Sequence, residues 1–402
     1  MTTTPAETVR VSPATILLAF LRLGLTSFGG PAAHIGYFRT EFVDRRGWMS
    51  DTAYAELVAL CQFLPGPASS QVGFAIGLRH GGYLGAAAAF VGFTAPSALL
   101  MLLFAAGISI LTDPSWTGVI HGLKLAAAAV VAHAVLGMAR GFCTGIAAAM
   151  IAAAAGAILL LAPGSLVQLA VIGGGALAGA FLLRPDGSGP DHAHNPPGTV
   201  FATLPLLIVF GLLLAACLLV DRGSVPSEIA IGAAFYEAGA LVFGGGHVVL
   251  PLLETSVVDP GWMDHDTFLA GYGAAQALPG PLFALSAYLG ALANPSGGVV
   301  GIAGGLIALV AIFVPGMLLV IAILPIWNRI RSRPQARAPI NGINAAVVGV
   351  LAAALIDPII LSTVRAPVDI VIAIGAFLAL QSLHAPPILV VAATATAGYF
   401  LT

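Results

Sequence analysis

The stretch Gln62-Phe-Leu-Pro65-Gly66-Pro67 recurs in the second half of the chain as Gln276-Ala-Leu-Pro279-Gly280-Pro281. Each copy interrupts a long apolar segment. Proline lacks the backbone donor that a helix needs, and its ring clashes with the preceding turn, so a helix has to break inside the Pro-Gly-Pro motif. The chain is therefore organised around two copies of one broken helix.

The duplication extends beyond this motif. The run Phe20–Gly30 aligns with Phe235–Gly245, and Gly47-Trp48-Met49 aligns with Gly261-Trp262-Met263. The shared order and nearly constant spacing of these matches indicate an internal repeat. Repeats that meet at a site near the middle of the membrane are typical of secondary transporters.

The composition places the chain in a membrane. Of its 402 residues, 59% are hydrophobic and only 8% are charged, whereas a soluble domain carries roughly 25% charged residues. Apolar runs such as Ala86–Leu111 and Val299–Leu324 exceed the roughly 20 helical residues that span a hydrocarbon core. Short segments with period-2 alternation are absent, which argues against a membrane β-barrel. We expect an all-α polytopic membrane protein, and no signal peptide at its polar start.

Hydropathy predicts about thirteen transmembrane helices in two inverted-topology repeats with broken helices. The predicted units are an N-terminal membrane repeat, a polar linker, a linking transmembrane helix and a C-terminal membrane repeat, at residues 1–184, 185–199, 200–220 and 221–402.

The positive-inside rule tests this topology. If every broken segment crosses the membrane, Arg10 and Arg79 face the cytoplasm, whereas Arg39, Arg45 and Arg46 face outward. If the broken segments re-enter, the arginines divide about evenly between the two sides. The rule weakly favours full crossing and inverted repeats.

The first break has the groups for an anion site. After the break, the amides of Ala68, Ser69 and Ser70 lack intrahelical acceptors, and amides and dipole at a helix N-terminus favour negative charge. Gln71 adds a polar side chain, whereas the second break is followed by Phe283-Ala-Leu. We therefore expect the first copy to hold an oxyanion and the second to shape the cavity. The alternative interpretation is a structural kink at each break.

A second group of candidates lies in the glycine-rich run that contains Ser27, Gly29, Gly30 and His34, which matches a run ending in His247. Glycine permits close approach of the backbone to a ligand, and histidine titrates near neutral pH. A plain helix–loop boundary with a hydrogen-bonded histidine is the alternative interpretation.

Charged residues inside apolar segments are functional candidates because they are costly there. Arg22 and Glu237 occupy equivalent positions in the two copies. We expect Arg22 to balance the charge of the anion, and Glu237 to pair with Arg22 or to carry a coupled proton. Lys124 is a second candidate anion contact. Snorkelling of Arg22 to the interface is the alternative.

Arg45 and Arg46, before Trp48, are typical of an amphipathic interfacial helix and are candidates for collecting anions at an entrance. The complete set of predicted substrate-binding residues is Arg22, Ser27, Gly29, Gly30, His34, Gln62, Gly66, Ala68, Ser69, Ser70, Gln71, Lys124, His247, Gln276 and Gly280, and the predicted structural breaks are Pro65, Pro67, Pro279 and Pro281.

Three motifs together resemble the chromate ion transporter family in its long two-domain form: Phe28–Gly36, Glu41–Trp48 and Gln62–Gly73. The resemblance covers nearly the whole chain. It implies export of chromate from the bacterial cytoplasm across the inner membrane, driven by the proton motive force, with sulfate as a competing anion. It also implies thirteen spans with oppositely oriented halves. Carried over by position, it points to Arg22, Gly29, Gly30, His34, Arg45, Arg46, Gln62, Pro65–Pro67 and Gln71.

Other functions remain open. The chain could transport another oxyanion such as sulfate, or act as a passive anion channel. A membrane-embedded enzyme is less favoured, because the apolar segments contain no paired carboxylates, metal cluster or nucleophile with a base. We expect no cofactor, no metal and no nucleic-acid partner. The expected partners are the oxyanion, protons and the lipid bilayer, and the sequence leaves a homodimer open.

Overall fold

A computed structural model describes residues 10–28, 30–111, 117–162, 165–183, 200–243, 249–293, 301–327, 337–383 and 385–401. The first half contains α1 (Pro13–Thr26), α2 (Gly30–Arg39), η1 (Thr40–Arg45), α3 (Asp51–Phe63), α4 (Ala68–Leu111), α5 (Thr117–Phe142), α6 (Ile146–Leu161) and α7 (Ser165–Leu182), and α8 (Val200–Leu219) follows.

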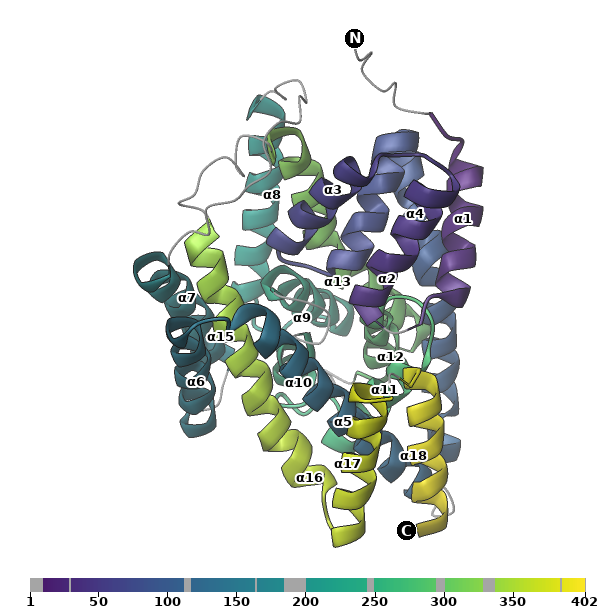
Figure 1. The fold of residues 1–402 in the computed structure, drawn as a ribbon, viewed down its shortest axis with the longest axis vertical. Helices are drawn as coiled ribbons and strands as arrows, with labels where there is room; N and C mark the ends of the chain where they lie inside the picture. Colours follow the sequence, from purple (N-terminus) through teal and green to yellow (C-terminus); the bar gives the residue numbers. More distant parts are fainter. Residues whose placement is uncertain are drawn as a thin grey trace.

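The second half repeats this order. It contains α9 (Ser227–Leu241), α10 (Val249–Val257), α11 (His265–Ala277), η4 (Leu282–Ala284), α12 (Leu285–Leu292), α13 (Ile302–Ile323), η5 (Leu324–Ile326), α15 (Arg337–Ala354), η7 (Leu355–Ile360), α16 (Leu361–Thr363), α17 (Pro367–Gln381) and α18 (Pro387–Leu401). The chain is an all-α polytopic membrane protein (Figure 1). Within the described residues, four helices are long and apolar enough to cross a membrane: Ala68–Gly107, Thr117–Phe142, Ile302–Ile326 and Ala338–Thr363.

Equivalent positions of the two halves share unusual backbone conformations. Gly82 has φ 63° and ψ −156°, which divides α4 into a first part (68–81) and a second part (83–111). Its counterpart Gly301, with φ 67° and ψ −144°, lies between α12 and α13. Positive φ is strained for residues with a β-carbon, so both copies use glycine to turn the chain at the same place.

The broken segments of the first half return to the end of the molecule from which they start. Val11 N–H donates to the carbonyl oxygen of His80 over 2.9 Å. The rings of Trp48 and His80 lie 5.6 Å apart, and Arg39 Nε lies 2.7 Å from the carboxylate of Asp51. The start of α1, the end of α2, the start of α3 and the end of the first part of α4 therefore lie together.

This return corrects the predicted placement of the arginines. Arg39, Arg45 and Arg46 lie at the same end as Arg10 and Arg79, and not at the opposite end, because α3 and the first part of α4 form a hairpin that turns back at Pro65–Pro67. A hairpin of this kind makes no net crossing, so the contacts point to fewer crossings than the thirteen counted from hydropathy.

Equivalent helices of the two halves run antiparallel to each other. The second part of α4 packs along α13, with the rings of Phe90 and Phe313 5.1 Å apart and Leu102 beside Gly305. The first helix starts near one end of the longest axis and the C-terminus lies near the other (Figure 1).

The two halves also exchange contacts. α5 packs against α17 and α18 of the second half, whereas α15 packs against α6 and α7 of the first half. Gly122 of α5 lies against the backbone of Thr394, and its counterpart Gly342 of α15 lies against the backbone of Gly175. Each half therefore completes its packing with the last helix pair of the other, although the sequence places the two repeats one after the other.

Candidate substrate site

The two helix breaks are joined by a reciprocal pair of hydrogen bonds. The N–H of Gly66 donates to the carbonyl oxygen of Val242 over 2.8 Å, and the N–H of Gly280 donates to the carbonyl oxygen of Ser27 over 2.9 Å. Val242 caps the C-terminus of α9 and Ser27 caps the C-terminus of α1. The tip of each break therefore lies at the end of the first helix of the other repeat, in the interior of the protein.

Gln71 holds the first break in place. Its Nε2 donates to the carbonyl oxygen of Pro65 over 2.9 Å and to that of Gly316 over 3.2 Å. Gly316 belongs to α13, so one buried amide joins the break of the first repeat to a long helix of the second. Gln71 thus has a structural contact at the break, and its predicted role in binding the substrate stays a prediction.

Several buried polar atoms at the first break lack a hydrogen-bond partner among the described residues: Ser27 Oγ, His34 Nε2, Ser70 Oγ and Gln71 Oε1. Ser27 and His34 have no exposed surface. His34 Nδ1 lies 3.4 Å from Ser69 Oγ, and its ring stands edge-on to Phe93 at 5.2 Å. Buried polar groups are almost always paired, so this cluster has the capacity to bind a polar ligand beside the N-terminus of α4.

The second break also contains a glycine with positive φ, but apolar residues follow it in the chain. Gly66 has φ 122° and Gly280 has φ 95°. Leu282, Phe283 and Ala284 form one 3-10 turn after Pro281, and the rings of Phe283 and Phe313 lie 5.9 Å apart. The predicted difference between a polar first break and an apolar second break is present in the structure, whereas its role in binding stays a prediction.

Ser97 of α4 lies beside Gly280 at the second break and donates to the carbonyl oxygen of Thr94 over 3.1 Å; the prediction included neither residue. Both are buried, Thr94 Oγ1 has no partner in the described part of the chain, and a β-carbon on Gly280 would lie 2.9 Å from Ser97 Oγ. The sequence contains a signal for this region: Pro96 lies inside an apolar segment, and Pro315 lies at the equivalent place in the second half.

Other predicted residues lie elsewhere. The side chains of Arg22 and Gln62 are exposed, so neither lines the buried site. Gln276 is half-buried and its Nε2 has no partner in the described ranges. Gly30 begins α2, whereas Gly29 and His247 lie outside the described residues.

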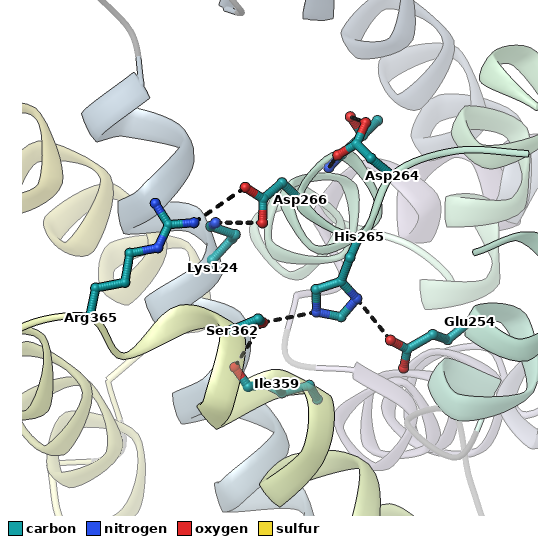
Figure 2. A network of polar contacts seen from close by, with 9 residues as sticks. Lys124, Glu254, Asp264, His265, Asp266, Ile359, Ser362 and Arg365 are labelled. Carbon is teal, nitrogen blue, oxygen red and sulfur yellow. Dashed lines mark hydrogen bonds and ion pairs between the residues drawn. The ribbon is translucent and has the colours of Figure 1, made fainter. Parts of the chain in front are cut away.

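The two predicted charge contacts are replaced by local ion pairs. Glu237 pairs with Arg222 and not with Arg22, because α8 and α9 pack together and bring Arg222 to the carboxylate. Lys124 Nζ lies 2.7 Å from Asp266 at the start of α11 (Figure 2). The charge of Lys124 is therefore compensated within the protein, away from the breaks.

Arg45 and Arg46 both bind Glu41. Arg45 Nη1 lies 3.1 Å and Arg46 Nε lies 2.6 Å from its carboxylate oxygens, and the guanidinium of Arg46 lies 5.3 Å from the centre of the Trp48 ring. Burial opposes ionisation of Glu41, but the hydrogen bonds and charges of Arg46 and Arg45 outweigh it and hold the pKa of the carboxyl below its usual range. Glu41 therefore binds two arginines at once, and neighbouring Arg39 pairs with Asp44 and Asp51.

Comparison with known proteins agrees with the duplication. The model of the chromate transporter family matches residues 14–180 and again residues 229–399. A probable chromate transport protein of Synechococcus elongatus is 29% identical, over 84% of this chain and 82% of the relative. Chromate transport proteins of Cupriavidus metallidurans and Pseudomonas aeruginosa are 27% and 26% identical, over 88% and 91% of this chain and 85% of each relative. No solved structure matches. Since the family model covers most of both halves, the chain belongs to the chromate transporter family.

Proposed function

We propose that the protein exports chromate, or a tetrahedral oxyanion of similar size, from the cytoplasm through the site at the first break, driven by the proton motive force. The observation that carries this proposal is the cluster of buried, unpartnered polar atoms around the N-terminus of α4, namely those of Ser27, His34 and Ser70. Its role in the cell is resistance to chromate.

The chemistry of the cluster suits a dianion. Hydroxyl groups and an imidazole N–H donate hydrogen bonds, and donors to an anion form stronger bonds than neutral pairs do. The N-terminal amides of α4 add donors and a favourable dipole. Thr94 and Gln276 supply further unpartnered atoms from neighbouring helices.

The charge distribution supports an orientation in the inner membrane. Arg10, Arg39, Arg45, Arg46 and Arg79 lie at one end of the molecule, and cytoplasmic loops are enriched in arginine and lysine. This end faces the cytoplasm in our proposal, and the antiparallel equivalent helices then form inverted-topology repeats. In this orientation Arg45 and Arg46 lie at the cytoplasmic entrance.

Energetics favour export. A membrane potential that is negative inside contributes about 2.3 kcal/mol per elementary charge for each 100 mV, so a dianion gains about twice that when it leaves. In alternating access the two repeats move relative to each other around the site. We expect the hydrogen bonds Gly66–Val242 and Gly280–Ser27 to break alternately during this movement, because they join the repeats on either side of the site.

Uptake of chromate into everted membrane vesicles tests the proposal. With respiration as the energy source, we expect saturable uptake that sulfate competes for and an uncoupler abolishes. A Ser70→Ala variant should raise KM, while the exposed Gln62→Ala change serves as a matched control near the same break. Absence of uptake in vesicles that contain the protein would exclude chromate as the substrate. Uptake that follows the membrane potential, without saturating and without responding to the pH gradient, would favour a channel.

A further inference from the structure

A second polar cluster lies at the far end of the molecule from the arginine-rich surface. Glu254 of α10 is buried, and its Oε1 lies 2.8 Å from Nδ1 of His265, the first residue of α11. His265 Nε2 lies 2.9 Å from Ser362 Oγ in α16. Figure 2 shows the histidine ring between the carboxylate and the hydroxyl.

The close approach of the ring and the carboxylate favours a bound proton. Ser362 Oγ donates to the carbonyl oxygen of Ile359 over 3.3 Å, so the hydroxyl accepts from His265 and the Nε2 carries hydrogen. Nδ1 then faces the carboxylate of Glu254. Nδ1 of His265 has no well-aligned hydrogen bond among the described residues, yet it lies 2.8 Å from the carboxylate oxygen. A lone pair and a carboxylate oxygen repel each other at this distance, so a proton on the carboxyl or on the ring stabilises the contact.

The pair lies on the wall of an acidic cavity of about 430 Å³ between α6 and α7 of the first half and α10, α11 and α15 of the second. Asp259 and Asp357 line this cavity and are exposed, so it opens to the surface between them.

Gln168 of α7 also lines the cavity. It is 3% exposed, and its Nε2 has no hydrogen-bond partner in the described ranges. A buried amide donor without a partner marks a place where solvent or a ligand oxygen binds.

Nearby basic groups do not neutralise the cavity. Lys124 Nζ lies 2.7 Å from Asp266, and Arg365 Nη2 lies 3.5 Å from the other oxygen of the same carboxylate. Neither Lys124 nor Arg365 lines the cavity. The described groups that face Glu254 are thus His265, Asp259 and Asp357, which favour uptake of a positive charge.

We propose that the Glu254–His265 pair binds the proton that is coupled to anion export. This inference rests on the proposed proton-driven function. In the release step, the O–H bond of the Glu254 carboxyl breaks, its electron pair stays on the oxygen, and the proton passes to solvent. Binding reverses this step from the cavity, which opens at the end opposite the cytoplasmic arginines and so meets the proton-rich side of the membrane.

The pair replaces Glu237 as the candidate for coupling. Glu237 pairs with Arg222, a permanent cation that cannot take part in proton transfer. Glu254 has only the titratable His265 as its ionisable partner among the described residues.

Purified protein in liposomes separates coupling from anion binding. Two rates are measured with labelled chromate: accumulation driven by an imposed pH gradient, and chromate–chromate exchange at equal pH. In Glu254→Gln, the side chain is neutral like the protonated acid, so we expect accumulation to fall by at least about tenfold while exchange stays within about twofold of the parent. Glu228→Gln, at an exposed carboxylate in the first turn of α9, is the matched control and should change neither rate.

The outcomes distinguish the two proposals. Accumulation that persists in Glu254→Gln overturns the coupling site while leaving proton-driven export intact. Loss of both rates assigns the pair to structure and also overturns it. Parent protein that exchanges chromate without responding to a pH gradient overturns proton-driven export itself, and the coupling site with it.

Discussion

The first break, at Pro65–Pro67, and the second, at Pro279–Pro281, share a positive-φ glycine and differ in the side chains that follow it. Both use a glycine with positive φ, and both donate one amide to the capping residue of the other repeat. After the first break the chain places Ser69, Ser70 and Gln71, whereas after the second it places Phe283, Ala284 and Leu285. Both repeats retain the Pro-Gly-Pro break, but only the first has polar residues after it. Equivalent residues of the two breaks can therefore be substituted and compared.

The largest expected effect is the exchange of Gln71 for its counterpart, Gln71→Leu. The carbonyl oxygens of Pro65 and Gly316 lose the donor that they share, and displacement of the break should reduce chromate transport by about 100-fold. Initial rates in everted vesicles, normalised to protein content, measure the effect. Leu285→Met at the equivalent position of the second break is the control, since volume-conserving swaps cost less than about 1.5 kcal/mol. Equal losses at both positions would mean that the breaks do not differ in function.

Ser70→Ala distinguishes a ligand group from a structural one. The hydroxyl has no partner within the described residues, so its removal should change thermal stability by no more than about 0.5 kcal/mol. If it binds the anion, KM should rise by about tenfold, which corresponds to one lost hydrogen bond of about 1.4 kcal/mol. A lower Tm with an unchanged KM would assign the hydroxyl to the fold instead.

Gly66→Ala and Gly280→Ala test the shared scaffold. At these positive φ values a β-carbon is strained by about 1–3 kcal/mol. The β-carbon would also lie 2.8 Å from Gln71 Nε2 at Gly66 and 2.9 Å from Ser97 Oγ at Gly280. We expect similar losses of Tm in detergent for both variants. A loss confined to Gly66→Ala would show that the second break tolerates a different backbone.

The smallest expected effect is the pH dependence of the Tm that arises from Glu41, in the segment after α2. Because the pKa of Glu41 is lowered in the folded protein from an ordinary value of 4.5, its stabilising contribution is complete above that pH and is lost as the pH falls below it. The Tm should fall in this acidic range, and Glu41→Gln should flatten that part of the profile. A parallel profile in the variant would contradict the role of Glu41.

Much of the fold follows from the sequence. Hydropathy predicted an all-α membrane protein, and the motif alignment identified the two breaks. The polar residues after the first break also lie where the sequence placed them, because proline and glycine act on the backbone locally and their effects are visible without any partner.

The ion-pair partners of the charged residues could not be predicted from local sequence. Arg22 and Glu237 occupy equivalent positions in the two repeats, but equivalent positions need not be in contact. In the folded protein Glu237 forms its ion pair with Arg222. Glu254 and His265 also carry no local sequence signal, because Glu254 lies at the end of an apolar run and its partner lies beyond a turn.

The amino-acid sequence by itself determined the helical membrane class, the duplication and the positions of the breaks, because each depends on composition or on local backbone chemistry. Only the tertiary structure decided that the broken segments turn back and that each break bonds to the other repeat. It alone also showed that α5 and α15 exchange their helix partners, and that Glu254 meets His265 beside an acidic cavity. These features depend on which surfaces meet across long sequence separations, and no local pattern of residues specifies that.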